Sequence, residues 1–524
     1  MPVVRGRMLG IYRTIPAAAC FGLLAACATV NFDYPKPGST AYDPAETRAT
    51  ALGRAVTDLV AGQPANHSGF HMLPDAVDAL AARLVLAALA ERSIDAQYYL
   101  IKADDAGLAF VRKLLEAADR GVRVRLLVDD MFMQGLDVGL AALDHHPNIE
   151  VRIFNPFANR GARFWDGLTD LSRVNRRMHN KSFTADNQVT IVGGRNIADE
   201  YFGSREDAVF GDLDFVAVGP VVDEISASFD AYWNHERAAP IGAFAAMPDD
   251  PDAALEALRR NLQAARERVT KAAYVEALNR SVLTFLDADS DSFEWAEYTV
   301  AVDSPDKSFK DRAPDTATIL TPLTESIGAA TGEVILVSPY FVPRKSGVES
   351  LLALERRGVE VKVVTNSLAA NNQFTVHGGY APSRKPLLKG GVEIYEVRRD
   401  AYFSGQEFVA ASGAKATLHT KAFIVDREDF FVGSFNFDPR SAYINTELGV
   451  LIRSAELASA AAQRIEASAA DGAWEVKLDD RGRLRWHGVG DDGQPVVLTK
   501  EPQTSWWDRF LAGFVRILPI RGQL

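Results

Sequence analysis

Hydrophobic positions along much of the chain alternate between helical spacing and short apolar runs, and one helix and strand unit of this kind occurs twice. A stripe of leucine and valine at helical spacing ends at Gly121, and the β-branched run 122–128 follows directly. A second such stripe ends at Gly358, and the run 359–364 follows. Glycine at this position is typical of a helix C-cap, and β-branched residues favour strands. The two glycines stand 237 positions apart, so the pattern predicts a duplicated structural unit.

Further strand-like runs correspond between the two parts of the chain. The run 94–101 precedes the first unit as 333–337 precedes the second, and the runs 149–154 and 392–397 follow them. Strands that alternate with helices are typical of α/β layers. We therefore expect an α/β fold with two similar α/β/α sandwich domains in one chain.

Changes in composition divide the chain further. The predicted divisions are a signal peptide at 1–26, a tether at 27–68, a first α/β domain at 69–240, a helical connector and strand at 241–325, a second α/β domain at 326–465 and a C-terminal extension at 466–524. In the connector, Pro251 begins a charged amphipathic pattern, which we expect to form a helix that joins the two domains. The extension is expected to form a small β unit and a final helix. Its apolar run 510–520 favours packing on the protein's own surface over a position in a membrane interface.

The N-terminus has the pattern of an export signal. Three arginines precede the apolar run 15–26, which is shorter than the roughly 20 residues that span a bilayer. The run leads into Leu-Ala-Ala-Cys, ending at Cys27, which resembles the lipobox of bacterial lipoproteins, where the cysteine becomes the lipid-modified N-terminus. A cleaved secretory signal and a weak helical anchor stay open as alternatives. We expect a lipid-anchored membrane protein of the bacterial cell envelope that faces the periplasm.

Composition and charge exclude several other classes of protein. The chain has 524 residues, 47% of them hydrophobic, which is enough for a large core and excludes a disordered protein or a mini-protein. Only Cys20 and Cys27 are present, so a disulfide framework and a zinc cluster of cysteines are excluded. The net charge is −12, and loss of three arginines with the signal peptide makes it −15. This balance argues against a non-specific nucleic-acid binder, so no nucleic-acid partner is expected.

One polar motif also occurs twice, with its two copies 240 positions apart. Each copy has a histidine, a lysine two residues later, an aspartate, a small residue and an asparagine. The first copy consists of His179, Lys181, Asp186, Gly194 and Asn196, and the second of His419, Lys421, Asp426, Ser434 and Asn436. Because this offset nearly equals that of the repeated helix and strand, the motifs belong to the same duplicated unit.

The spacing within the motif has a physical use. On a strand, residues two apart project from one face, so the histidine and lysine of each copy point the same way. A turn at the aspartate and a return strand bring the asparagine beside them. If the two domains pack with these faces opposed, two histidines, two lysines and two asparagines surround one cavity. Such a site suits a phosphodiester, because one imidazole can attack phosphorus, the other can serve as acid and base, and the lysines and asparagines can stabilise phosphoryl oxygens. We expect no metal ion and no cofactor.

The paired motif resembles that of the phospholipase D superfamily, in which two HxK(x)4D(x)6G(G/S)xN segments form a single site. Here the motif segments are 173–200 and 413–440. Further stretches are similar to the cardiolipin synthase C type of bacterial phosphatidyltransferase: GGRNIADEYF at 193–202, SPYFVP at 338–343, TNSL at 365–368, VHGGY at 376–380 and LPI at 518–520. The resemblance implies transfer of a phosphatidyl group to the hydroxyl of phosphatidylglycerol, with phosphatidylethanolamine as one candidate donor and cardiolipin as the product.

The resemblance also implies roles for the motif residues. His179 is expected to be the nucleophile that forms a phosphohistidine, and His419 to be the acid and base. Lys181 and Lys421 match phosphate-binding positions.

The remaining motif positions are expected to support the phosphate site. Asn196 and Asn436 are predicted to contact the substrate. Gly194 stands where the second copy has Ser434, so one hydroxyl donor is absent and the two halves are expected to bind phosphate unequally.

Four acidic residues are candidates for supporting roles. Asp186 and Asp426 complete the catalytic motif, but their place at a strand end favours holding the hairpin over direct catalysis. Asp214 and Glu447 follow the two motifs in comparable strands, and we expect them to orient the imidazoles. A surface acid beside a strand is the alternative for both.

Two further residues and the choice of reaction stay open. His377 and Tyr380 match a VHxGY stretch of the family and are expected to touch the lipid head group, with a buried structural role as the alternative. A hydrolytic phospholipase D would carry the same residues, and a nuclease or an inactive scaffold lipoprotein are further alternatives.

Ala28 after Cys27 favours the outer membrane, whereas the lipid substrates favour the inner one. The donor lipid, any protein partner and the oligomeric state are not predicted.

Overall fold

The computed structural model describes residues 29–203, 208–269, 292–309, 318–401, 415–490 and 493–515. Within these ranges, 18 strands form one continuous mixed sheet. From one edge to the other they are β20 (Pro495–Leu498), β19 (Leu484–Val489), β18 (Ala473–Leu478), β13 (Glu393–Val397), β12 (Glu360–Asn366), β11 (Glu333–Val337), β15 (Ala422–Val425), β16 (Asp429–Gly433), β17 (Leu448–Arg453), β10 (Glu294–Val302), β1 (His67–Leu73), β8 (Asp214–Val218), β6 (Val189–Gly193), β5 (Ser182–Ala185), β2 (Ser93–Tyr98), β3 (Arg123–Asp129), β4 (Ile149–Phe154) and β9 (Ala238–Pro240).

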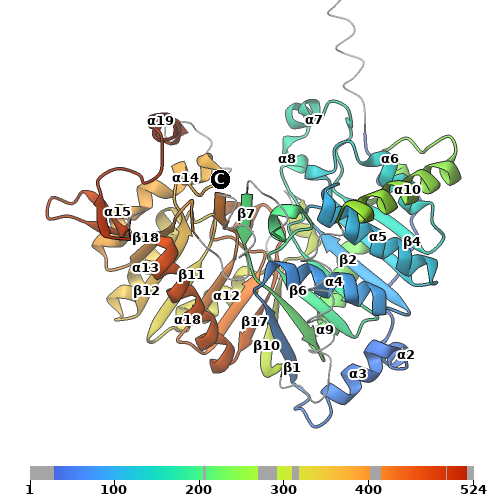
Figure 1. Cartoon of the computed structure of the whole chain (residues 1–524), viewed down its shortest axis with the longest axis horizontal. Helices are drawn as coiled ribbons and strands as arrows, with labels where there is room; N and C mark the ends of the chain where they lie inside the picture. The colour runs from blue at the N-terminus through green and yellow to red at the C-terminus, as the bar shows by residue number, and fades with distance from the viewer. Residues whose placement is uncertain are drawn as a thin grey trace, which may run out of the picture.

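The strand order is the same on both sides of the antiparallel pair β1 and β10. Outward from β1 come β8, β6, β5, β2, β3 and β4, and outward from β10 come β17, β16, β15, β11, β12 and β13. In each half the last three of these strands are parallel. The duplicated α/β fold predicted from the sequence is confirmed, and the two halves lie side by side on a shared sheet (Figure 1).

Helices cover both faces of the sheet. In the first half α4 (Ala76–Leu89), α5 (Asp105–Asp119) and α6 (Asp137–Asp144) share one core with the strands, and α9 (Val221–Trp233) packs on the other face. In the second half α12 (Leu320–Ala329) and α13 (Arg344–Arg356) pack on one face, with α15 (Arg384–Lys389) beside α13, and α18 (Ala455–Gly472) packs on the other. Shorter elements include η2 (Asp130–Phe132), α7 (Phe164–Thr169), α8 (Leu171–Val174), η3 (Asp199–Tyr201), η4 (Ile241–Ala243), η6 (Pro305–Ser308), α14 (Phe374–Tyr380), η7 (Ala381–Ser383) and α17 (Pro439–Tyr443).

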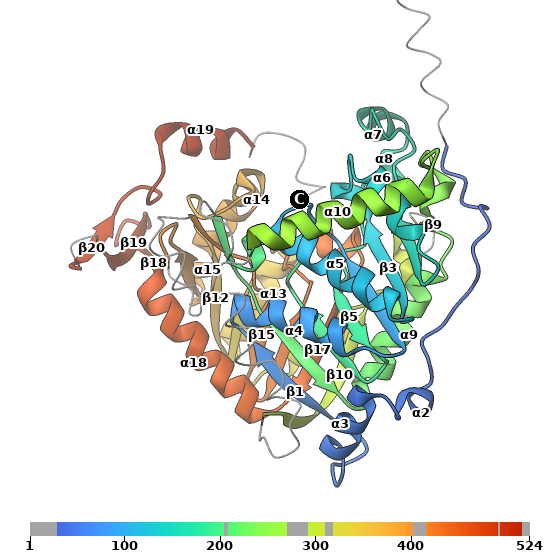
Figure 2. The same cartoon turned by 45° about the vertical axis from the view of Figure 1, so that its right-hand side comes forward.

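Two predictions about connecting segments need correction. The connector helix forms as α10 (Pro251–Val269), but it packs on α5 and α6 of the first half and does not bridge the halves in the described residues (Figure 2). The expected tether is folded from residue 29 onward. It contains α2 (Pro44–Thr47) and α3 (Ala51–Leu59), and buried arginines of the first half hold its backbone, as where Arg125 Nη1 donates to Ser39 O at 2.9 Å. Cys27 and the predicted signal peptide lie outside the described residues.

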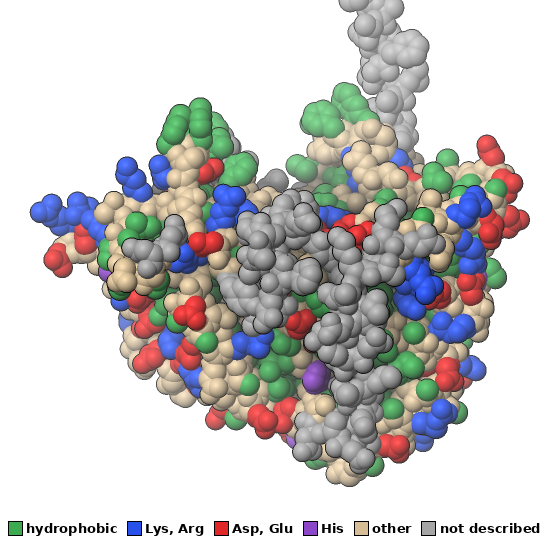
Figure 3. Space-filling model, viewed as in Figure 1, with side chains coloured by type: hydrophobic (Ala, Val, Ile, Leu, Met, Phe, Trp, Pro, Cys, Tyr) green, Lys and Arg blue, Asp and Glu red, His purple; other side chains and the backbone are tan. Residues whose placement is uncertain are grey.

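The C-terminal extension adds β18, β19 and β20 to the edge of the second half and ends in α19 (Trp506–Val515). This helix packs against α14 through one side, where Ala512 is buried. Its large apolar side chains remain exposed, and Figure 3 shows them projecting from the surface. The expectation that this segment buries its apolar face on the protein is therefore wrong for its aromatic residues.

Candidate active site between the two halves

The two motif histidines lie on segments that cross from one half to the other. The backbone N–H of His179 donates to Thr446 O of the second half at 2.9 Å, and Met178 and Thr446 form a parallel bridge. The N–H of His419 donates to Gly211 O of the first half at 2.7 Å. Just before it, β14 (Lys415–Leu418) pairs in parallel with β7 (Ala208–Gly211), which Figure 1 shows at the centre of the molecule. Each histidine is thus fixed to the half that does not supply it.

Each imidazole is held by a carboxylate of the opposite half. His179 Nδ1 lies 2.7 Å from Oε2 of Glu447, and His419 Nδ1 lies 2.5 Å from Oδ2 of Asp212. Although burial opposes ionisation, the neighbouring histidine and lysines lower the pKa of Glu447 and hold that of Asp212 well below its usual range. An ionised carboxylate can only accept, so each Nδ1–H donates. The Nε2 atom of each neutral ring therefore carries the lone pair.

Burial also sets the charge of the histidines and lysines. It lowers the pKa of His179 to about 4 and that of His419 to about 3, so both rings are neutral near pH 7. It lowers the pKa of Lys181 to about 7 and that of Lys421 to about 8, and the carboxylates oppose this shift. Lys421 Nζ lies 3.0 Å from His419 Nε2, and Lys181 Nζ donates to His179 O at 2.5 Å. Two lysine side chains thus lie beside two neutral imidazoles in one buried site.

Asp214 was expected to orient an imidazole, and the structure assigns that contact to Asp212. The carboxylate of Asp214 forms buried ion pairs with Arg83 at 2.9 Å and Arg195 at 3.3 Å. Asp214 belongs to β8, whereas Asp212 lies in the link between β7 and β8, next to His419. The prediction for Asp214 is therefore wrong, and that for Glu447 agrees with its contact to His179.

A sequence signal for Asp212 exists but needs the correct register between the repeats. Aligning Asp212-Leu213 with Glu447-Leu448 places Asp214 opposite Gly449. The structure has this register, because Asp214 pairs with Gly193 as Gly449 pairs with Gly433.

The motif aspartates do not contact the imidazoles and instead accept hydrogen bonds from backbone N–H groups. Asp186 accepts hydrogen bonds from the N–H groups of residues 91–93 at 2.7 to 3.2 Å. Asp426 accepts from the N–H groups of residues 331–333 at 2.7 to 2.9 Å. In each half the aspartate thus ties the hairpin to the start of the neighbouring strand, β2 or β11. These contacts favour the structural role over the catalytic one.

The structure explains why the motif has glycine at position 194 in the first half and serine at position 434 in the second. A Cβ added at Gly194 would lie 2.1 Å from Oδ1 of Asp212, so a side chain there would displace the carboxylate that holds His419. At the equivalent position Ser434 Oγ donates to Oε2 of Glu447 and accepts from Leu448 N at 3.0 Å. The serine hydroxyl therefore steadies the carboxylate, and its predicted contact with phosphate is not supported.

The motif asparagines are buried with polar atoms still available. Asn196 Nδ2 donates to the hydroxyl of Tyr201 at 2.8 Å, and the Tyr201 ring packs edge-on against His419 with ring centroids 5.0 Å apart. The side-chain Oδ1 atoms of Asn196 and Asn436 have no hydrogen-bond partner among the described residues. Contact of these amides with substrate stays a prediction. Tyr201 was not singled out from the sequence, where an aromatic residue after the motif is an ordinary core signal.

His377 and Tyr380 lie in a buried network of the second half. The Tyr380 hydroxyl donates to Oε1 of Glu396 at 2.9 Å, and His377 Nε2 lies 3.5 Å from Oε1 of Glu501. Arg384 bridges the same two glutamates. Both predicted head-group residues are almost fully buried, at 1% and 2% exposure, so the structural alternative fits them better.

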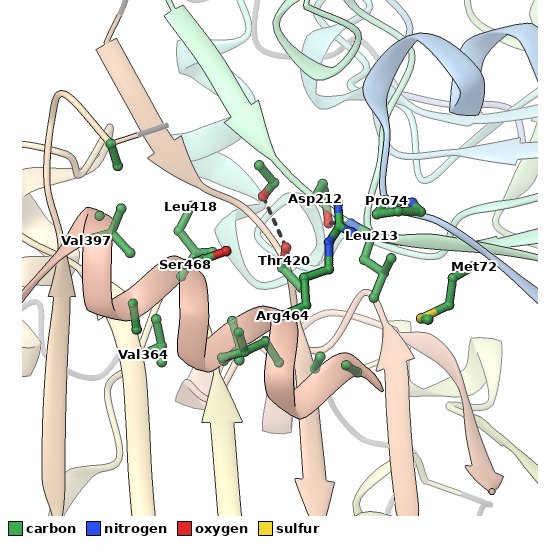
Figure 4. Close-up of a pocket in the computed structure, with 18 residues that line it drawn as sticks. Met72, Pro74, Asp212, Leu213, Val364, Val397, Leu418, Thr420, Arg464 and Ser468 are labelled. Atoms are coloured by element: carbon green, nitrogen blue, oxygen red, sulfur yellow. Dashed lines mark hydrogen bonds between the residues drawn. The ribbon is translucent and has the colours of Figure 1, made fainter. Parts of the chain in front are cut away.

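A small cavity lies between the site and α18. It has a volume of about 110 Å³, and Asp212 and Thr420 line it on one side and Arg464 and Ser468 of α18 on the other (Figure 4). Sites for small organic molecules usually measure about 300 Å³ or more. This cavity is therefore too small for a phospholipid head group with its glycerol.

Comparison with known proteins identifies the family. The family model described as "Cardiolipin synthase, PLD-like domain" matches residues 85–233 and 323–468. Cardiolipin synthase C of Escherichia coli (strain K12) is 40% identical over 477 residues, which are 90% of this chain and 98% of that protein. An uncharacterized protein of Helicobacter pylori (strain ATCC 700392 / 26695) is 32% identical over 96% of this chain and 97% of its own length.

A solved structure has the same fold. The crystal structure of phosphatidylserine synthase from Haemophilus influenzae Rd KW20 aligns with 89% of this chain and 97% of its own chain, with a TM-score of 0.53 and 13% sequence identity. The resemblance inferred from the paired motifs is confirmed: the chain belongs to the cardiolipin synthase family of phospholipase D-like proteins.

Proposed function

We propose that the protein is a phosphatidyltransferase that makes cardiolipin by moving a phosphatidyl group to phosphatidylglycerol. One observation carries this proposal. Two neutral imidazoles, each held at Nδ1 by a carboxylate of the other half, share one buried site with two lysines. The similarity to a cardiolipin synthase C along nearly its whole length supports the choice of lipid substrates.

In the first step Nε2 of His179 attacks the phosphorus of the donor lipid. A P–N bond forms, the bond from phosphorus to the leaving alcohol breaks, and His419 gives its Nε2 proton to the departing oxygen. His419 must first gain that proton. The bound phosphodiester is an anion, so it offsets the burial and the lysine charges that disfavour protonation of the ring.

In the second step the acceptor hydroxyl completes the transfer. His419 takes the proton from a hydroxyl of phosphatidylglycerol as that oxygen attacks phosphorus, and the P–N bond to His179 breaks. Lys181 and Lys421 supply positive charge to the non-bridging oxygens in both steps. Glu447 and Asp212 keep the two rings in the tautomer that exposes Nε2 to phosphorus.

The proposal includes a lipid anchor at Cys27 and a site that faces the periplasm. None of the helices in the described residues is long and apolar enough to cross a bilayer. An anchor would raise the effective concentration of the enzyme at its lipid substrates.

The test is a lipid assay in mixed micelles with excess chelator. Purified protein is given labelled phosphatidylglycerol, with or without phosphatidylethanolamine, and the products are separated. We expect cardiolipin, lost in His179→Ala and in His419→Ala but kept in the control His145→Ala, whose imidazole bonds to Asp252 on the surface. Phosphatidic acid alone would make the protein a hydrolase, and absence of any lipid product would refute the proposal.

A further inference from the structure

Two exposed apolar patches project from the same side of the molecule. The first patch consists of Phe164, Trp165, Leu168 and Leu171 of α7 and α8, with exposures between 39% and 71%. The second patch consists of Trp506, Trp507, Phe510, Leu511 and Phe514 of α19, with exposures between 42% and 58%. Figure 3 shows them as two apolar projections, and Figure 1 shows β7 at the centre of the molecule, between α19 and α7. Apolar side chains gathered in this way mark an interaction surface.

The first patch is joined to His179 by a short series of contacts. Arg163, the N-cap residue of α7, donates through Nη1 to Asp130 O at 2.7 Å and so fixes the helix to the η2 turn. Phe132 in that turn packs edge-on against Tyr99, with ring centroids 5.4 Å apart. The Tyr99 ring in turn lies 4.9 Å from that of His179.

The second patch is joined to His419 in a similar way. Thr417 in β14, two residues before His419, donates through Oγ1 to Ala370 O at 2.8 Å. Shortly after Ala370 the chain forms α14, which begins at Phe374 and packs against α19. Each half thus contributes one apolar patch and ties it to its own motif histidine.

One further exposed apolar residue lies along each of these two series of contacts. Phe132, beside the Tyr99 and His179 rings, is 51% exposed. Phe374, at the start of α14, is 48% exposed.

The start of the described chain lies beside the first patch. Asn31 N donates to Ala243 O at 3.4 Å, and the Phe32 ring lies 5.8 Å from the guanidinium of Arg173 in α8. Cys27 is two residues before Thr29, which is at most about 7 Å of chain. A lipid on that cysteine would therefore enter the bilayer next to α8.

We propose that the two patches form a membrane-docking face that lays the shared site against a lipid surface. Tryptophan and phenylalanine on short amphipathic helices suit the boundary between head groups and acyl chains. The anchor position selects a bilayer as the occupant, because the same side of the molecule would already be held there. This inference rests on the membrane location in the proposed function and is independent of phosphatidyl transfer.

Quenching of tryptophan fluorescence by brominated lipids tests the docking face. Full-length lipidated protein is reconstituted in vesicles of phosphatidylethanolamine and phosphatidylglycerol at 3:1, with bromine on the acyl chains. The anchor keeps every variant at the surface, so quenching reports contact of the rings with lipid. Trp233, Trp474 and Trp486 are at most 3% exposed and are insensitive. We expect part of the emission to be quenched, with Trp165→Phe and the pair Trp506→Phe and Trp507→Phe removing separate shares.

Charge substitutions complete the design. F164E with L168E should abolish quenching at Trp165, and F510E with F514E should abolish it at Trp506 and Trp507. V497E is the matched control, since Val497 in β20 is 54% exposed and outside both patches, and it should leave quenching unchanged. Thermal melting confirms that each variant is folded.

Three results would overturn the inference. One is the absence of quenching in the unaltered protein, and another is equal loss of quenching in V497E. The third is a dimer in lipid-free detergent that dissociates in the charge-substituted variants, together with no quenching in vesicles. That result would assign the face to a second copy of the chain. Quenching without cardiolipin synthesis in micelles would leave this inference standing and refute the proposed function instead.

Discussion

Nδ1 of His179 lies 2.7 Å from Oε2 of Glu447, a residue 268 positions later in the chain, and the second pair, His419 with Asp212, crosses in the opposite direction. Neither half therefore contains a complete histidine and carboxylate pair. The site exists only when the halves are assembled.

Glu447→Gln tests the role of the carboxylate at His179. Glutamine can still accept a hydrogen bond from Nδ1–H, but it removes the negative charge that balances the imidazole during attack. We expect kcat to fall by about 10²- to 10⁴-fold with little change in KM. Steady-state kinetics in mixed micelles measures the split. A fall confined to KM would instead assign Glu447 to substrate binding.

Asp212→Asn and Asp214→Asn should separate catalysis from stability. Asp212→Asn removes the partner of His419, so kcat should fall as for Glu447→Gln while the protein still melts cooperatively. Asp214→Asn leaves Arg83 and Arg195 without their buried counter-charge, which costs about 3–5 kcal/mol of stability. Chemical denaturation beside kinetics distinguishes the two variants. Equal loss of kcat and equal stability in both would contradict the assignment.

Gly194→Ser copies the second half's serine into the first half and should inactivate the enzyme. The new Cβ would lie 2.1 Å from Oδ1 of Asp212 and displace that carboxylate from His419. The reverse change, Ser434→Gly, removes one hydrogen bond to Glu447 and should cost about 10- to 100-fold in kcat. Full activity in Gly194→Ser would show that Asp212 has room to move.

Asp186→Ala should lower stability more than activity. The carboxylate accepts from three consecutive backbone N–H groups, and leaving the buried one, that of Ser93, without a partner costs about 1–3 kcal/mol. Below its melting temperature the folded variant should keep kcat within about threefold, since general acid–base groups alone would cost 10²-fold or more. A loss of kcat by 10²-fold without a change in melting would return Asp186 to the catalytic set.

The pH dependence of kcat should be bell-shaped, since the bound phosphodiester lets His419 hold the proton that the first step needs. The nucleophile must be neutral, and burial lowers the pKa of His179 to about 4, so activity falls as the pH drops through 4. The lysines must be charged, and burial lowers the pKa of Lys181 to about 7, so activity falls again as the pH rises above 7. Lys181→Arg should remove the alkaline limb due to this group, because arginine stays charged. An unchanged alkaline limb in that variant would contradict the assignment.

Much of the fold was predictable from local pattern. The glycine C-caps at Gly121 and Gly358 and the strands after them mark the duplicated unit, and the two HxK triplets mark the site. These signals depend on residues close in sequence, which periodicity and spacing can read.

Contacts between the halves were not predictable in the same way. Asp212 and Asp214 are both acids near a strand start, and only the pairing of β7 with β14 brings Asp212 to His419. The exposed face of α19 was missed for a related reason. Its apolar pattern is the same whether the helix packs on protein or on lipid, and the surface available on α14 decides how much is buried.

The most direct test of the account is to find the covalent intermediate. Protein mixed with phosphatidylglycerol labelled at phosphorus is denatured in alkali, where a phosphorus–nitrogen bond survives, and the labelled peptide is identified by mass spectrometry. We expect label on His179, and none in His179→Ala. Cardiolipin formed at full rate with no label on His179 at any time would contradict it.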